Sequence, residues 1–129
     1  MFRTTTLATA ITVALSGAAF AGDISTHVLN TTTGTGGAGI PVTLEMQADG
    51  AWIQIGTGET GENGRVKGFG IEAEDALYRL NFDVSGYEAL GDAPFFPSVS
   101  VTFHIQNTAR EHHIPILINP FGYSTYLGN

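Results

Sequence analysis

The stretch that decides the fold is Ile114-Pro115-Ile116-Leu117-Ile118, an apolar run that follows the adjacent histidines His112 and His113. Its short length and its isoleucine content favour a β-strand buried on both faces over a helix. Proline donates no hydrogen bond to a neighbouring strand, so the run is predicted to lie at a sheet edge or to contain a bulge. A buried strand that begins with histidine can position a reactive side chain, because the packed strand holds the histidine rigidly in place.

Five further strands are predicted, at residues 25–30, 42–47, 52–55, 77–84 and 99–105. Several of them alternate apolar and polar residues, which marks a strand with one solvent-facing side. Ala48-Asp49-Gly50 is expected to join two of them as a hairpin, and residues 106–111 to close another hairpin into the C-terminal run. Residues 31–39 and 56–64 are rich in glycine and threonine and are predicted to be loops.

One short helix is predicted at residues 85–90, with Ser85 as its N-cap, Glu88 completing a capping box and Gly91 ending it. A strand start at Arg65 and a short polar-aromatic segment after Gly122 bring the expected number to seven or eight short strands. Such strands with one small helix predict an all-β fold, an antiparallel β-sandwich. The glycine-rich loop ends in an Asn63-Gly64 turn signal just before Arg65. Because no helix follows that loop, the sequence disfavours a phosphate-binding loop, and the position of Arg65 alone favours a solvated arginine at a strand end.

Residues 1–21 are predicted to be a cleaved signal peptide, and residues 22–129 to form one domain. A positive start at Arg3 is followed by a small, apolar segment, and Ala19-Phe20-Ala21 offers the small-x-small pattern that a signal peptidase needs. The apolar segment is too short for a comfortable membrane span. We therefore expect export, to a bacterial periplasm or as a secreted protein.

The charge of the chain excludes two classes of partner. The formal net charge is −7 at pH 7, whereas nucleic acids and anionic membranes bind to basic surfaces. The chain also has no cysteine, so the exported domain folds without disulfides. A domain of this size buries only about two-thirds of its unfolded surface, which makes oligomerisation a natural supplement.

Four segments together resemble the transthyretin-like family, and within it the branch of the 5-hydroxyisourate hydrolases. They are residues 26–29 (Thr-His-Val-Leu), 39–45 (Gly-Ile-Pro-Val-Thr-Leu-Glu), 60–65 (Thr-Gly-Glu-Asn-Gly-Arg), and 95–103 (Phe-Phe-Pro-Ser-Val-Ser-Val-Thr-Phe) followed by 113–126. The resemblance covers essentially the whole predicted mature chain in the right order. The combination of His27, Arg65 and His113 resembles the hydrolases and not the hormone carriers.

The resemblance implies a homotetramer with its sites in the channel between dimers, and it implies His27, Arg65 and His113 as catalytic residues. The family's closing Tyr-Arg-Gly-Ser reads Tyr126-Leu127-Gly128-Asn129 here, so Tyr126, Leu127 and Asn129 are the expected substrate-binding residues. Two of these four residues differ from the family pattern. The chain also has Asn30 and Glu111 where the family often has aspartate and histidine.

The implied reaction opens 5-hydroxyisourate, a flat oxidation product of urate, with water to give 2-oxo-4-hydroxy-4-carboxy-5-ureidoimidazoline in purine catabolism. Two histidines would activate water and transfer protons, and Arg65 would hold ring oxygens or developing charge. No metal or other cofactor is expected. Losing a charge-assisted hydrogen bond at Leu127 would cost about ten- to a hundredfold in turnover or binding. Zinc ligation by His104 and His112 across a hairpin is a weaker alternative.

Two other functions fit the same residues. The first is an exported transthyretin-like protein that binds a small ligand and has reduced or lost catalysis. The second is an exported structural or interaction domain, in which His27, Arg65 and His113 are surface residues scattered over the molecule. Retention of a ligand without turnover would favour the first, and scatter of the three residues in the folded chain would favour the second.

Overall fold

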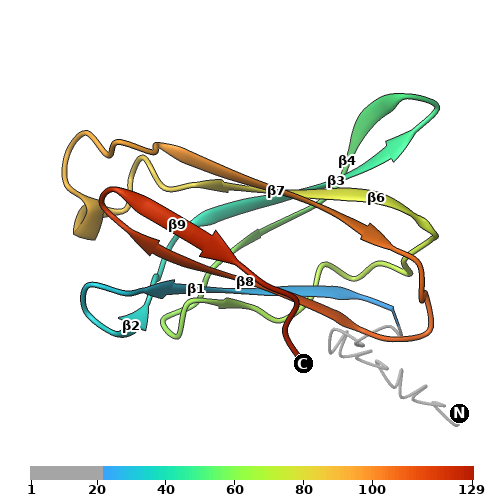
Figure 1. The fold of residues 1–129 in the computed structure, drawn as a ribbon, viewed down its shortest axis with the longest axis horizontal. Coiled ribbons are helices and arrows are strands. Elements are labelled where there is room, and N and C mark those ends of the chain that lie inside the picture. The colour runs from blue at the N-terminus through green and yellow to red at the C-terminus, as the bar shows by residue number, and fades with distance from the viewer. Residues whose placement is uncertain (1–21) are drawn as a thin grey trace, which may run out of the picture.

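The computed structural model describes residues 22–129, which fold into two β-sheets packed face to face (Figure 1). The predicted signal peptide lies outside these residues. The elements are β1 Ile24–Asn30, β2 Thr35–Gly36, β3 Pro41–Ala48, β4 Ala51–Glu59, β5 Arg65–Val66, β6 Ala76–Asp83, the 3₁₀-helix η1 Glu88–Leu90, β7 Ser98–Ile105, β8 His112–Asn119 and β9 Gly122–Thr125. No helix of the described residues is long and apolar enough to cross a membrane.

One sheet has the strand order β4-β3-β6-β7, and all its pairs are antiparallel. The other sheet, here called the site sheet, has the order β2-β1-β8-β9, and β5 also pairs with β1. The predicted β-sandwich with one short helix is confirmed, with one exception: β1 and β8 run parallel. The hairpin expected at residues 106–111 is wrong, because β7 and β8 belong to different sheets and the connection crosses between them.

Pro115 lies in an interior strand, which corrects the expected edge position, since β8 is flanked by β1 and β9. The missing N–H group is accommodated by the neighbouring strand instead. β9 ends at Thr125, whose hydroxyl donates to the Pro115 carbonyl over 2.8 Å, and the next pairing along the same register is the isolated bridge of His113 with Gly128. The ladder is therefore interrupted opposite the proline, as the lack of a donor requires.

Two local predictions were also wrong. η1 begins at Glu88, so Tyr87 and not Ser85 takes the N-cap position and no side chain caps the helix; the Ser85 hydroxyl donates to Asp83 over 2.5 Å instead. Residues 56–59 belong to β4 and not to a loop, because they pair with β3 beyond a bulge at Leu44/Glu45. The turn between β3 and β4 is confirmed: Asp49 and Gly50 both have positive φ, which suits a tight hairpin.

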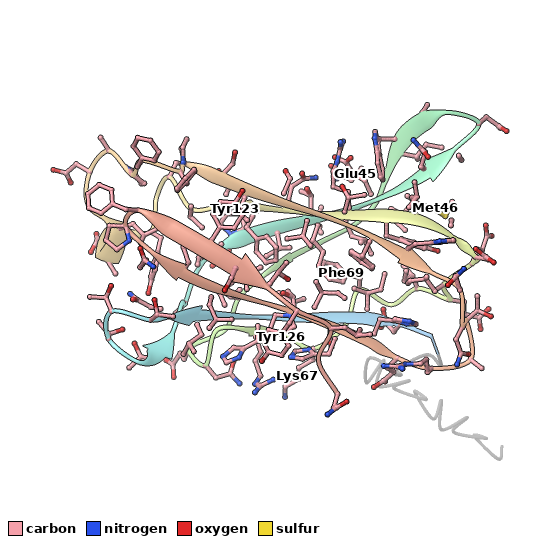
Figure 2. The ribbon with its side chains drawn as sticks, viewed as in Figure 1. Glu45, Met46, Lys67, Phe69, Tyr123 and Tyr126 are labelled. Carbon is pink, nitrogen blue, oxygen red and sulfur yellow. The ribbon has the colours of Figure 1, made fainter. Side chains whose placement is uncertain are left out.

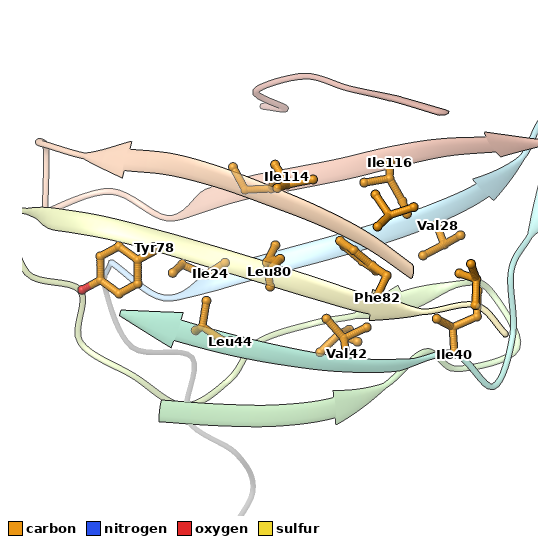
Figure 3. Close-up of a cluster of buried hydrophobic side chains, with 14 of the residues drawn as sticks. Ile24, Val28, Ile40, Val42, Leu44, Tyr78, Leu80, Phe82, Ile114 and Ile116 are labelled. Atoms are coloured by element: carbon orange, nitrogen blue, oxygen red, sulfur yellow. The ribbon is translucent and has the colours of Figure 1, made fainter. Parts of the chain in front are cut away.

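The core fills the space between the two sheets with aliphatic and aromatic side chains (Figure 3). Alternate residues of the central strands point inward, and the fully buried set includes Ile24 and Val28 of β1, Val42 and Leu44 of β3, Tyr78, Leu80 and Phe82 of β6, and Ile116 of β8. Fully burying one such side chain contributes about 1.5–3 kcal/mol. Because β1 and β8 turn these residues inward, the intervening residues of both strands point out of the site sheet.

Candidate active site

β1 brings the predicted catalytic residues together, because it pairs with β5 on one side and with β8 on the other. The antiparallel register places His27 beside Arg65, and the parallel register places Ser25 beside His113. Residues 25 and 27 lie on the same side of a strand, opposite the buried Thr26 and Val28. The three residues therefore share the outer face of the site sheet, which excludes their scatter over separate surfaces.

A tight turn sets the position of Arg65. Gly64 has φ +80°, and a Cβ atom there would lie 2.4 Å from the Val28 carbonyl oxygen, so glycine is required. The Asn63 side chain accepts the Arg65 backbone N–H over 3.0 Å. The Asn-Gly turn predicted from sequence is thus confirmed, and it delivers Arg65 to β1.

A buried carboxylate holds the chain that follows Arg65. Asp23 is 5% exposed, and its side chain accepts the backbone N–H groups of Ile24, Phe69 and Gly70 over 2.7, 3.1 and 3.1 Å. A Cβ atom at Gly68 would lie 2.5 Å from one of its oxygens. Asp23 therefore fixes residues 68–70 against the start of β1. Sequence reasoning missed this residue, because nothing in its surroundings along the chain signals the contact.

Each histidine of the site has one ring nitrogen occupied. The His27 Nε2 lies 3.0 Å from the Asn63 carbonyl oxygen, which can only accept, so Nε2 donates. The His113 Nδ1 lies 2.8 Å from the Ser25 hydroxyl, which can donate or accept. These bonds leave His27 Nδ1 and His113 Nε2 as the atoms available for proton transfer.

Burial and neighbouring charge keep both imidazoles neutral. Burial lowers the pKa of His27 below its ordinary value of 6.5, and the Arg65 guanidinium lowers it further, against the opposing effect of the bond to Asn63. Burial likewise lowers the pKa of His113, and both Arg65 and His27 add to the effect. A neutral imidazole can accept a proton at neutral pH, which an imidazolium cannot. The shared influence of Arg65 shows that the three groups form one electrostatic unit.

A hollow of about 180 Å³ opens beside this unit, lined by Ser25, Thr26, Arg65, Val66, Lys67 and His113. Lys67 and Ser25 were not selected from the sequence. Period-two counting from Arg65 and His27 would have placed both on the same face, but only the pairing of β5 with β1 brings them together.

The C-terminal residues divide between two places. Gly128 pairs with His113 and donates to its carbonyl oxygen over 2.8 Å, which brings the C-terminal segment to the site sheet. Tyr126 and Leu127 are exposed and line a separate, larger hollow of about 420 Å³ beside β7. Figure 2 shows Tyr126 and Lys67 on the same lower side of the site sheet. Substrate binding by Tyr126, Leu127 and the exposed Asn129 stays a prediction.

The alternative of a zinc site at His104 and His112 finds no third ligand among the described residues. His104 and His112 both line the larger hollow, but His104 Nε2 bonds Asp75 over 2.7 Å, and within residues 22–129 no three potential ligand side chains gather as a metal site requires.

A model of the HIUase/Transthyretin family matches residues 24–128. The chain belongs to this family. A 5-hydroxyisourate hydrolase of Salmonella dublin is 38% identical over 109 residues, which cover 82% of this chain and 80% of that relative. The solved 5-hydroxyisourate hydrolase of Klebsiella pneumoniae superposes with a TM-score of 0.71 at 28% identity, covering 83% of this chain and 99% of that one.

Family membership confirms the resemblance drawn from the sequence. The fold is also that of sea bream transthyretin, solved in complex with thyroxine, with a TM-score of 0.75, 27% identity and coverage of 82% and 94% of the two chains. The β-sandwich is thus transthyretin-like, and the family contains both named hydrolases and a protein solved with a bound ligand.

Removing the Arg65 charge should raise the pKa of both site histidines. We expect Arg65→Met to shift the NMR titrations of His27 and His113 to higher pH, because the guanidinium lowers both values in the native protein. Arg110→Met is the matched control: it should raise the pKa of His112, which Arg110 lowers, and leave the site histidines unchanged. Unshifted titrations of His27 and His113 in Arg65→Met would contradict the electrostatic unit.

Proposed function

We propose that this chain hydrolyses 5-hydroxyisourate, the reaction named for its bacterial relatives. The observation that carries the proposal is the meeting of His27, Arg65 and His113 on one face of the site sheet, although they are distant along the chain. Two neutral imidazoles beside one guanidinium can move protons and stabilise an oxyanion, which are the two requirements for opening an amide-like bond.

The reaction adds one water molecule across a ring bond. The water oxygen attacks the ring carbonyl carbon, the carbon–nitrogen bond breaks, the nitrogen takes a proton, and the carbonyl becomes a carboxylate. His27 Nδ1 and His113 Nε2 are the free ring atoms that can take the proton from water and return one to nitrogen. Arg65 provides a planar fork of N–H donors for the ring oxygens or the charge that develops on them.

The pH dependence of the rate follows from the lowered pKa of both histidines. A base with a lowered pKa stays unprotonated below its ordinary value of 6.5, so the acid limb of kcat/KM should lie below pH 6.5. Folding stability changes with pH in the same direction as the rate. The unfolded chain binds these protons more readily, so the contribution of both histidines is present above pH 6.5 and is lost as the pH falls.

The turnover assay tests the proposal. We expect the mature chain to accelerate the loss of 5-hydroxyisourate absorbance, and Arg65→Ala to lower kcat/KM about a hundredfold, because a preorganised charged donor is worth roughly 10²–10³ in rate. Equal rates for the two proteins would sink the assignment.

Gly128 keeps the edge of the His113 ring open. A Cβ atom at residue 128 would lie 2.7 Å from His113 Cδ2, a distance at which the ring must move. Gly122 in β9 is the matched control, since a Cβ atom there would make ordinary contacts at 3.6 and 3.7 Å with Asn119.

Gly128→Ala should therefore reduce turnover up to about a hundredfold by displacing His113, because misplacement by about 1 Å costs this much. Gly122→Ala should leave turnover within about twofold. Urea unfolding of both variants separates a displaced ring from a destabilised domain. Full activity in a folded Gly128→Ala protein would contradict the role of His113.

We also propose a homotetramer for the working protein. The hollow beside Arg65 lies at the surface of one chain, where the Arg65 and Lys67 side chains are exposed, and a second copy across the site sheet would close it over substrate. Two exposed aromatic side chains further support assembly. Phe95 and Phe121 lie just before the first residues of β7 and β9, are 69% and 79% exposed, and have ring centroids 6.5 Å apart. Light scattering of the mature chain tests this, and a monomer at micromolar concentration would contradict it.

Export is proposed from the sequence of residues 1–21 alone. The mass of the protein recovered from the periplasm of an expressing bacterium should match a chain that starts at Gly22, and an uncleaved cytoplasmic product would contradict it.

A ligand-binding function without catalysis is the second candidate, supported by the similarity to transthyretin solved with thyroxine. Retention of the ring without turnover would favour it.

A further inference from the structure

Lys67 lies on the face of the candidate site, one step beyond Arg65. The register that pairs His27 with Arg65 places Lys67 opposite Ser25, just past the end of β5. Ser25 pairs on its other side with His113 and bonds its ring. Two rows of side chains thus cross the site sheet, one from Arg65 to His27 and one from Lys67 through Ser25 to His113.

The backbone around Lys67 is fixed from both ends. Val66 on one side pairs with Thr26 of β1. On the other side the Asp23 carboxylate binds the N–H groups of Phe69 and Gly70. The Lys67 side chain is exposed, but its point of attachment is held on the site sheet, and it lines the same hollow as Arg65 and His113.

Among the residues that the structure describes, no carboxylate forms an ion pair with Arg65 or Lys67, the two cations of the hollow. Within residues 22–129 the ion pairs join Arg79 to Glu45 and His104 to Asp75, and no acidic residue lines the hollow. Arg79 also covers the Trp52 ring at 4.3 Å on the outer face of the other sheet. In an acidic chain with formal net charge −7, two unpaired cations on one face are a local exception that favours an anionic ligand.

We propose that Lys67 is a second substrate-binding cation, which holds the carboxylate formed as the ring opens. The inference rests on the proposed hydrolysis. Residues two apart on a strand lie roughly 6.5–7 Å from each other, a separation that suits groups on opposite sides of a purine-sized ring. Arg65 then contacts one side of the ring, while the Lys67 ammonium meets the carbonyl oxygen that becomes carboxylate.

Two measurements on Lys67→Gln test this role. Its kcat/KM for 5-hydroxyisourate should fall about tenfold, and its affinity for urate, a flat anion that water does not open here, should weaken by a similar factor, because a charge-assisted contact is lost. Lys67→Arg should restore most of both. Arg110→Gln, which changes the net charge equally, should leave both within about twofold. The rate of wild-type protein should also decline more steeply with salt than that of Lys67→Gln.

The outcomes separate this inference from the proposed function. Turnover by the wild type that Lys67→Gln matches would overturn the role of Lys67 and leave the hydrolase intact. Urate binding that depends on Lys67, without any turnover, would support Lys67 and overturn the hydrolase. Urate binding that is undetectable in the wild type, or equal in Lys67→Gln and Arg110→Gln, would overturn the role of Lys67.

Discussion

The site depends on one constraint, the pairing of β1 with an antiparallel strand on one side and a parallel strand on the other. β5 contributes only two residues, yet its register with β1 decides which cations stand beside His27 and Ser25. β8 contributes His113, which is the first residue of this strand to face outward. A slip of one residue in either pairing would turn the polar set into the core and the core set into solvent. The buried faces of β1 and β8 therefore protect the site register.

Burial and the charge placed by this register set the chemistry of the histidines. Burial lowers the pKa of both imidazoles, the Arg65 guanidinium lowers it further, and His27 adds to the effect on His113. Each imidazole is also oriented by one bond, to the Asn63 carbonyl or the Ser25 hydroxyl. Arg65, the cation that lowers both pKa values, also lines the hollow and can bind an anion there. Activation of water and recognition of substrate thus have a common electrostatic cause.

The features that could be predicted from the sequence are those that a local residue pattern determines. Alternation located β3, β6 and β7, and the Asn63-Gly64 signal located the turn before Arg65. The family pattern selected His27, Arg65 and His113, which the fold brings together. Which strands pair with each other was harder to predict, since the parallel pairing of β1 and β8 joins residues that are far apart along the chain. Ser25, Lys67 and Asp23 were missed for this reason: each acts through a neighbour that only the register or a loop contact provides. The crossing at residues 106–111 is a further example, because a short polar link looks the same within a sheet and between sheets.

The position of a bound ring tests the central claim most directly. Two hollows compete for it, the one beside Arg65 and His113 and the larger one beside Tyr126 and Leu127. The larger hollow contains His112, a buried side chain whose Nδ1 has no hydrogen-bond partner within residues 22–129, but it lacks Arg65 and His113, which line the smaller hollow. In a crystal structure of the protein with urate, we expect the ring on the outer face of the site sheet, in contact with the Arg65 guanidinium and the His113 ring. Density for urate only in the hollow beside Tyr126 and Leu127 would contradict the assignment of the site.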